Sequence, residues 1–492
     1  MMAKSSRHKE IERKFDVVES TVSPSFDGLS AVARVERLPT QHLDAVYYDT
    51  ADHDLARNRV TLRRRTGGTD EGWHLKLPAG ADARTEVRSP LGPETVPDEL
   101  LDVVLAVVRD KPLAPVAQIT TNRNVQMLYG ADGAALAEFC DDQVTASAGS
   151  DGEPQQWREW ELELAEGTPA AGSAELLDRL GNRLFDAGAA PAGSGSKLAR
   201  VLATAGPQDD ERPAPPKDPI HRAVAEQVAE LVTWDRAVRA DTYDSVHQMR
   251  VTTRKLRSLL KESEESFGLT DDSWVLDELR QLAAILGVAR DAEVLAEKYE
   301  KALADLPDEL LRGPVRERLV DGARHRYDVG LRRSLAAMRT TRYFRLLDAL
   351  EGLAVADPVA AESEDQELKP VTLGGAYKRV RKAAKAAEDA QTEDRDEALH
   401  RIRKGAKRLR YTAAATGAGK VSDAAKAVQT LLGDHQDAVV SRTHLAQQAD
   451  AAHAAGEDTF TYGLLYQQED DLARTTREQL ADALKSLDKA MK

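Results

Sequence analysis

Over the first two hundred residues, polar and apolar side chains alternate in short segments, which is the pattern of β-strands. The strand candidates are residues 8–17, 45–50, 60–66, 72–77, 83–89, 119–129, 134–141 and 157–164. Residues 97–108 and 173–187 have helical spacing instead. The pattern predicts an α+β region dominated by an antiparallel sheet or barrel.

Beyond residue 218 the pattern changes to the helical periodicity of Ala, Leu, Arg and Glu, which continues to Lys492. The prolines between residues 205 and 218 forbid a regular helix or a central strand, so this segment is expected to be an extended linker. A second gap rich in Pro, Glu and Asp, residues 357–370, splits the helical half. We therefore expect a first domain at 1–204, a linker at 205–218 and an all-α bundle at 219–492, with halves at about 219–356 and 371–490.

The helical half contains an internal repeat. The segment from His247 to Arg257 matches the segment from His400 to Arg410 at a constant offset of 153 residues. A second pair follows in the same order, because residues 286–294 resemble residues 432–440 and each contains Leu-Gly followed by Asp. These two matched motifs predict a duplicated helical unit with pseudo-twofold symmetry.

Composition limits the classes of function. The net charge of −15 argues against a general nucleic-acid coat protein, because binding phosphates over a large surface needs a basic protein. The single cysteine, Cys140, excludes an internal disulfide and fits a reducing cytosol. The sequence has neither a secretory signal nor a run of roughly 20 apolar residues that could span a membrane. We expect a cytoplasmic protein that binds no membrane and no specific nucleic acid.

Several strand candidates carry charged residues along one face, which a dry core would exclude. These faces are the solvated sides of an open sheet, or they converge on a polar cavity. In a cavity, carboxylates would suit Mg²⁺ or Mn²⁺, while guanidinium and ammonium groups would bind phosphate oxygens. Glu10, Glu12 and Lys14 share one face of their strand, and Glu159, Glu161 and Glu163 form an acidic face. The basic or mixed faces are Arg63-Arg65, Lys76, Arg84-Glu86-Arg88 and Arg123.

In this order the segments resemble the CYTH superfamily, the triphosphate tunnel metalloenzymes. The resemblance covers residues 6–204 and begins with Glu10-Ile11-Glu12-Arg13-Lys14, which matches the ExExK signature. Further matching segments are residues 48–50, 62–65, 75–77, 84–86, 161–164 and 196–200. The resemblance implies an eight-stranded antiparallel barrel that forms a tunnel, and metal-dependent hydrolysis of a substrate that carries a triphosphate.

The resemblance also implies roles for individual residues. The catalytic group is Glu10, Glu12 and Lys14. The ligands of Mg²⁺ or Mn²⁺ are Glu10, Glu12, Asp141, Glu161 and Glu163, and Glu138 and Glu159 match the pattern less firmly. The substrate-binding residues are Lys14, Arg63, Arg65, Lys76, Arg123 and Lys197, to which spacing alone adds Arg88.

The repeated helices each carry a stripe of basic residues. His247, Arg250, Arg254 and Arg257 are three and four residues apart, so they share one helix face, and His400, Arg403, Lys407 and Arg410 repeat the spacing. The repulsion within each stripe must be offset by glutamates on neighbouring helices or by an anionic polymer between the two stripes. Metal binding by the paired histidines is the weaker interpretation, because neither copy has a second ligand at suitable spacing.

This half resembles the CHAD domain over residues 219–490, which implies binding of inorganic polyphosphate. The candidate polyphosphate-binding residues are His247, Arg250, Arg254, Lys255, Arg257, Lys378, Arg381, His400, Arg403, Lys407, Arg408 and Arg410. The order CYTH then CHAD resembles the bacterial inorganic triphosphatases.

Together the two resemblances predict divalent-metal-dependent hydrolysis of inorganic triphosphate in the tunnel, with polyphosphate bound by the CHAD domain. Two alternatives stay open. A non-catalytic polyphosphate-binding or targeting protein would need the basic faces but not the paired glutamates. A tunnel enzyme acting on thiamine triphosphate or a nucleoside triphosphate, including an adenylate cyclase, would use the same tunnel.

Overall fold

The computed structural model describes residues 6–79, 83–149, 152–165, 167–168, 170–205, 216–270, 273–356, 373–388, 395–415 and 417–492. Most of the predicted linker, residues 206–215, and the predicted gap at 357–370 lie outside the described residues. The chain forms two compact units, one of Met1–Ser263, Asp272–Leu279 and Ala337–Pro358, and one of Glu264–Asp271, Arg280–Ala336 and Val359–Lys492. The division into domains at 1–204 and 219–492 stays a prediction.

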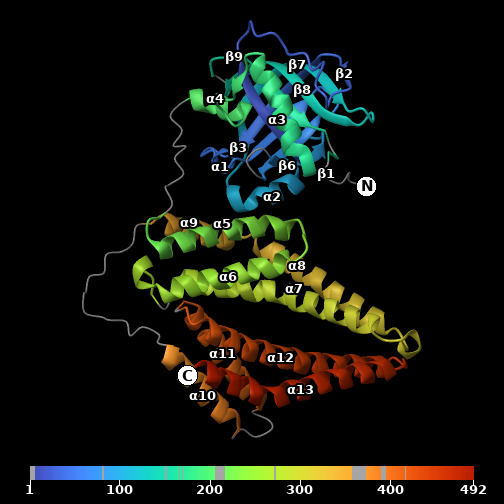
Figure 1. Cartoon of the computed structure of the whole chain (residues 1–492), viewed down its shortest axis with the longest axis vertical. Coiled ribbons are helices and arrows are strands. Elements are labelled where there is room, and N and C mark those ends of the chain that lie inside the picture. The colour runs from blue at the N-terminus through green and yellow to red at the C-terminus, as the bar shows by residue number, and fades with distance from the viewer. Residues whose placement is uncertain are drawn as a thin grey trace. The chain divides into compact units, whose positions relative to one another are not determined.

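Within the described residues, eight antiparallel strands close into a barrel in the order β1-β6-β5-β4-β3-β7-β8-β9, and β9 pairs back with β1 (Figure 1). They are β1 (Ser6–Val17), β3 (Gln41–Asp49), β4 (Thr61–Thr66), β5 (Gly72–Pro78), β6 (Ala83–Pro90), β7 (Ala114–Tyr129), β8 (Ala135–Ala148) and β9 (Gln155–Leu164). Two short strands, β2 (Arg34–Arg37) and β10 (Ala190–Pro191), pair with β7 and β1. The predicted eight-stranded antiparallel barrel is confirmed.

The barrel strands turn their apolar faces outward, toward covering helices. Trp160 and Leu162 of β9 share a buried cluster with Leu180 of α3 (Ala170–Asp186), which lies across the outside of the barrel (Figure 1). Trp73 of β5 packs in the same way with residues of α2 (Asp98–Val108). Each buried large apolar side chain contributes about 1.5–3 kcal/mol. Because side chains alternate along a strand, the charged faces consequently point into the barrel.

One end of the barrel interior is covered by α4 (Lys197–Ala205). Its residues Leu198, Val201 and Leu202 are buried against the interior-facing Ala45 and Ile119. This packing brings Lys197, the first residue of α4, to the barrel interior. The short helix α1 (Asp54–Arg57) follows β3 and is held by the buried Asp49 carboxylate, which accepts hydrogen bonds of 2.9 Å from the amides of Leu55 and Ala56.

The rest of the chain is helical. The first unit also contains α5 (Pro219–Arg239), α6 (Ser245–Glu262) and α9 (Thr341–Val355), and α7 (Trp274–Ala304) belongs to both units. The second unit contains α8 (Gly322–Ala337), α10 (Leu373–Glu388), α11 (Arg395–Ala415), α12 (Gly419–Ala454) and α13 (Phe460–Ala490). Short 3₁₀ turns lie at Glu265–Phe267 and Asp308–Leu310, and a π-helical turn lies at Glu317–Asp321.

In the second unit α12 and α13 run side by side (Figure 1), and Val380, Leu409, Val428 and Leu487 belong to a common core of α10 to α13. The predicted all-α region is confirmed, while its internal duplication stays a prediction. Among the described helices, no segment combines the length and the apolar character that a membrane crossing requires.

Candidate active site

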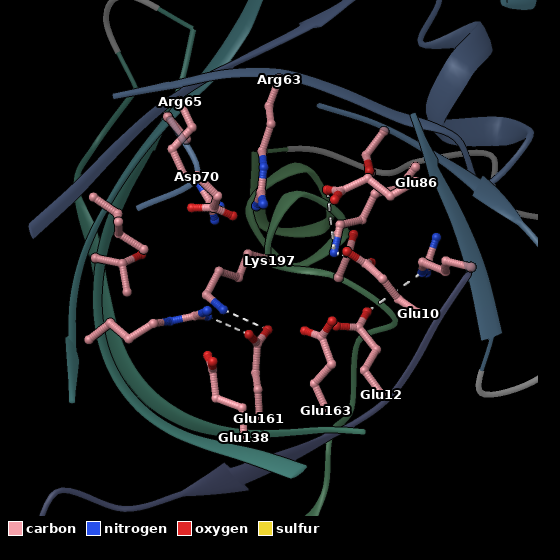
Figure 2. A pocket seen from close by; sticks show the side chains of 18 of the residues that line it. Glu10, Glu12, Arg63, Arg65, Asp70, Glu86, Glu138, Glu161, Glu163 and Lys197 are labelled. Atoms are coloured by element: carbon pink, nitrogen blue, oxygen red, sulfur yellow. Dashed lines mark hydrogen bonds and ion pairs between the residues drawn. The ribbon is translucent and has the colours of Figure 1, made fainter. Parts of the chain in front are cut away.

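The barrel encloses a polar cavity of about 500 Å³ (Figure 2). Glu10, Glu12 and Lys14 of β1 face into it, as their alternation with Ile11 and Phe15 requires. The described lining residues include eight cations and seven carboxylates, so the charged faces of the strands converge instead of facing solvent. The cations are Lys14, Arg63, Arg65, Lys76, Arg84, Arg88, Arg123 and Lys197, and the carboxylates are Glu10, Glu12, Asp70, Glu86, Glu138, Glu161 and Glu163.

The structure brings together all the residues that the sequence assigned to the phosphate chain. Figure 2 shows Arg63 and Arg65 of β4 on the side of the cavity opposite Glu12, Glu161 and Glu163, with Lys197 between them. Arg65 is buried, and burial together with the charge of Arg63 lowers its pKa to about 10. Arg65 donates to the carboxylate of Asp70, which lines the same cavity. Guanidinium groups on one wall of a cavity favour the binding of a further anion.

One carboxylate group is neutralised within the protein. Glu161 Oε1 lies 2.5 Å from Lys14 Nζ and 2.8 Å from Lys197 Nζ, and Arg123 donates to its other oxygen at 2.5 Å. Burial alone would raise the pKa of Glu161, but these cations hold it well below its usual value. Glu161 is therefore ionised, and it holds three cations of the cavity in place.

A second carboxylate group, formed by Glu10, Glu12 and Glu163, has fewer cations per carboxylate, because Lys14 and Arg84 lie near Glu12 and Lys76 and Arg88 near Glu10. Burial alone would raise the pKa of Glu12, but the charges of Lys14 and Lys76 lower it to about 2. Lys76 Nζ lies 2.5 Å from Glu10 Oε2, and Lys14 Nζ lies 3.0 Å from Glu12 Oε2. Burial, aided by the charges of Glu10 and Glu12, raises the pKa of Glu163 to about 8, and burial also raises the pKa of Glu10. Carboxylate oxygens are hard ligands that suit Mg²⁺ or Mn²⁺. A divalent cation held by carboxylates of this group would keep Glu10 and Glu163 in the ionised form.

Glu86 is a cavity residue to which the sequence gave no role. It is fully buried, and its oxygens lie 2.8 Å from His74 Nδ1 and 3.0 Å from His8 Nε2. Arg88 donates to the same carboxylate. His8, Glu10 and Glu86 place one ligand atom each within 4.8 Å of one another, so His8 and Glu86 can assist Glu10 in holding a cation. In the sequence, the signal that could have identified Glu86 was its alternation with Arg84 and Arg88 on one strand face.

Asp141 is the predicted ligand that the structure does not bring to the cavity. Its carboxylate accepts two hydrogen bonds from Arg158, at 2.8 and 2.6 Å, and one from the Ser23 hydroxyl. The neighbouring Asp142 takes the interior position instead, because it is fully buried and accepts from Arg123 at 2.8 and 2.6 Å. Glu138 lines the cavity, and residues at an even spacing from it share its face, which excludes Asp141.

The predicted polyphosphate-binding residues lie on three helices. His247, Arg250, Arg254, Lys255 and Arg257 are on α6 of the first unit, whereas Lys378 and Arg381 on α10 and His400, Arg403, Lys407, Arg408 and Arg410 on α11 belong to the second. The histidines and first arginines of both stripes are half-buried.

Within the second unit the two repeated motifs meet. A Cβ added at Gly433 of α12 would lie 3.4 Å from Arg403 Nη2, so the glycine of the Leu-Gly motif leaves room for the arginine of the basic stripe. Burial raises the pKa of Asp437, and the charges of Arg403 and Lys298 oppose the shift.

Family models match both parts of the chain. A CYTH domain model matches residues 8–181, and a CHAD domain model matches residues 222–446. Two proteins of Mycobacterium tuberculosis described as uncharacterized, from strains CDC 1551 and H37Rv, are each 66% identical over 504 residues. Each match covers 99% of this chain and 98% of the relative.

Solved structures match separate parts of the chain. PptA from Streptomyces chartreusis is 19% identical and covers 55% of this chain and 100% of its own, with a TM-score of 0.44. The CHAD domain from the plant Ricinus communis is 24% identical and covers 54% of this chain and 90% of its own, with a TM-score of 0.40.

Proposed function

Because the chain belongs to the family of proteins that join a CYTH domain to a CHAD domain, we propose that its barrel hydrolyses inorganic triphosphate with Mg²⁺ or Mn²⁺. The observation that carries the proposal is the enclosed cavity in which eight cations meet seven carboxylates. Binding an anionic chain alone would need the cations only. Glu10 and Glu163, whose pKa values are raised by burial, would be held in the ionised form by a divalent cation that accompanies the phosphates.

Each wall of the cavity has a part in the reaction. Glu10, Glu12 and Glu163 would hold the divalent cation, which would supply Lewis-acid polarisation of a phosphoryl group. A carboxylate oxygen of this group would accept a hydrogen bond from the attacking water and orient it. Arg63, Arg65 and the other cations bind the chain oxygens and stabilise the negative charge that develops on the leaving phosphates.

Lys14, Lys197 and Arg123 start from ion pairs with Glu161. Phosphate oxygens would bind these cations beside the Glu161 carboxylate, which stays paired with them. Substrate binding then leaves no buried carboxylate without a partner, which would be costly.

For the helical region we propose binding of inorganic polyphosphate by the basic stripes of α6 and α11. The spacing of the basic residues supports this role, because the stripe from His400 to Arg410 lies on one face of α11. Salt-sensitive binding of polyphosphate, lost when His400 and Arg403 are both replaced by glutamine, would support the proposal.

Phosphate release from inorganic triphosphate, ATP and thiamine triphosphate, each with Mg²⁺, with Mn²⁺ and with a chelator, tests the reaction. The proposal predicts metal-dependent turnover that is fastest for inorganic triphosphate. Preference for ATP or thiamine triphosphate would identify a different tunnel enzyme. Polyphosphate binding without turnover of any of the three would leave a non-catalytic binding protein.

A further inference from the structure

A second cavity, of about 750 Å³, adjoins the first and shares Glu12, Lys14, Thr61, Arg84 and Ser196 with it. We propose that this vestibule binds the continuation of a linear polyphosphate whose first phosphates occupy the barrel. The inference rests on the proposed function, which it extends from triphosphate to longer chains of the same chemistry.

The vestibule lies where β1 changes partner along one edge. The ladder with β6 ends at the pair of Ile11 and Ala83, and the ladder with β10 begins at the pair of Phe15 and Pro191. At Phe15 the opposite edge of β1 is taken by β9, so β6 and β10 follow one another along the same edge. Glu12, Arg13 and Lys14 lie between the two ladders. Glu12 and Lys14 line both cavities, and Arg13 lines the vestibule.

The charge of the vestibule differs from that of the barrel cavity. Its described lining residues include five cations, Arg13, Lys14, Arg57, Arg59 and Arg84, against one carboxylate, Glu12. The protein as a whole carries a net charge of −15, so this basic surface is a local exception. Such a patch at the mouth of a cavity concentrates anions there.

Arg84 connects the two cavities. Its guanidinium group donates to the carbonyl oxygens of Arg59 at 3.2 Å and Gly195 at 3.1 Å, and its Nε lies 3.8 Å from Glu12 Oε1. It is thereby fixed at the junction, where an anionic chain passing from one cavity to the other would meet it. Ser196 and the start of α4 line the same passage, and the amide groups at a helix N-terminus favour negative charge.

A polyphosphate carries negative charge on every phosphate and has no organic group, so several arginines are sufficient to bind it. Arg57 and Arg59 are exposed at the outer end of the vestibule, whereas Arg84 is at the inner end. The vestibule also has an apolar side that includes Phe185 and Pro191. A nucleoside would use that side, so ATP serves as the competing ligand in the test.

An introduced cysteine reports on the vestibule independently of catalysis. Phe185 is 42% exposed and lines the vestibule, and the one natural cysteine, Cys140, is buried. The alkylation rate of Phe185→Cys is measured in the full chain with linear polyphosphate, inorganic triphosphate or ATP. Val22→Cys is the control, because Val22 is 80% exposed and lines neither cavity.

We expect polyphosphate to slow alkylation of Phe185→Cys about tenfold, triphosphate to have little effect, and Val22→Cys to be unaffected by either. Adding Arg57→Gln and Arg59→Gln should abolish the protection by polyphosphate. Equal protection by triphosphate, stronger protection by ATP, or protection that persists without Arg57 and Arg59 would overturn the inference. A protein that shows the expected protection but releases no phosphate would contradict the proposed reaction while keeping the vestibule as a binding site.

Discussion

Lys197 Nζ lies 2.8 Å from Glu161 Oε1, and the same ammonium group contacts Asp142 at 2.8 Å and Glu159 at 2.7 Å. Burial alone would lower the pKa of Lys197, but the three carboxylates raise it well above its usual value. The first residue of α4 is therefore held by charges of β8 and β9, and one lysine occupies a group of oxygens that could otherwise bind a metal ion.

Replacing Lys197 should destabilise the protein, because its three carboxylate partners would repel one another. Lys197→Met leaves three buried carboxylates without their shared cation, so we expect the free energy of unfolding to fall by about 3–5 kcal/mol. Mg²⁺ should restore more stability to the variant than to the wild type, because the ion can take the place of the ammonium group. Thermal unfolding with and without Mg²⁺ measures both effects.

Lys485→Met is the control for Lys197→Met. Lys485 is exposed on α13 and pairs with an exposed aspartate, so its loss should change stability by about 0.5 kcal/mol or less. If Mg²⁺ stabilised the two variants equally, the position of the Lys197 ammonium group would not be one that a metal ion can take.

Gly433→Ala should raise stability and weaken polyphosphate binding. Alanine in place of a glycine inside a helix gains about 1 kcal/mol, but the added Cβ would lie 3.4 Å from Arg403 Nη2, at the limit of close contact, and would shift the guanidinium group slightly. We therefore expect a higher unfolding midpoint together with weaker binding of polyphosphate. Gly463→Ala on α13, where a Cβ meets nothing within 4 Å, should raise stability without changing binding. Unchanged binding in Gly433→Ala would remove Arg403 from the proposed site.

The stability of the second unit should depend on His444. Arg326 donates to His444 Nε2 at 3.0 Å, so the neutral ring carries its hydrogen on Nδ1, which lies 3.0 Å from Tyr299 Oη. Burial and the charge of Arg326 lower the pKa of His444 from 6.5 to about 4. Between these two values the unfolded chain binds a proton that the folded protein does not, so stability falls as the pH falls from 6.5 toward 4.

Urea unfolding of His444→Gln at several pH values checks this dependence. The variant should lose part of the decrease in stability below pH 6.5 that the wild type shows. His453→Gln, at an exposed position of the same helix, should keep the wild-type profile. Identical profiles for the wild type and His444→Gln would exclude His444 as a source of the pH dependence.

Much of the barrel was predictable because its alternation is strict. Glu10, Glu12 and Lys14 could be placed on one face from spacing alone, and the CYTH and CHAD resemblances are confirmed by the matching family models. The assignment of Asp141 overlooked the spacing from Glu138, because Asp142 lies at an even spacing from Glu138 and shares its face, whereas Asp141 points to the opposite face.

Other parts of the site depend on contacts between distant segments. Glu86 alternates with Arg84 and Arg88, and a solvent-exposed strand face would show the same pattern of charges. Its burial depends on His74 and His8 from two other strands. The contact of Lys197 with Asp142 likewise requires the packing of α4 against the barrel end, which local periodicity does not contain.

The most direct measurement is phosphate release from inorganic triphosphate by the wild type, by Glu10→Gln and by Glu175→Gln over a range of Mg²⁺ concentrations. Glu175 is 69% exposed on α3 and serves as the matched control. The account predicts metal-dependent release that Glu10→Gln reduces at least about a hundredfold and Glu175→Gln leaves unchanged. Release that needs no metal, or that Glu10→Gln leaves intact, would contradict hydrolysis at the carboxylates of the barrel.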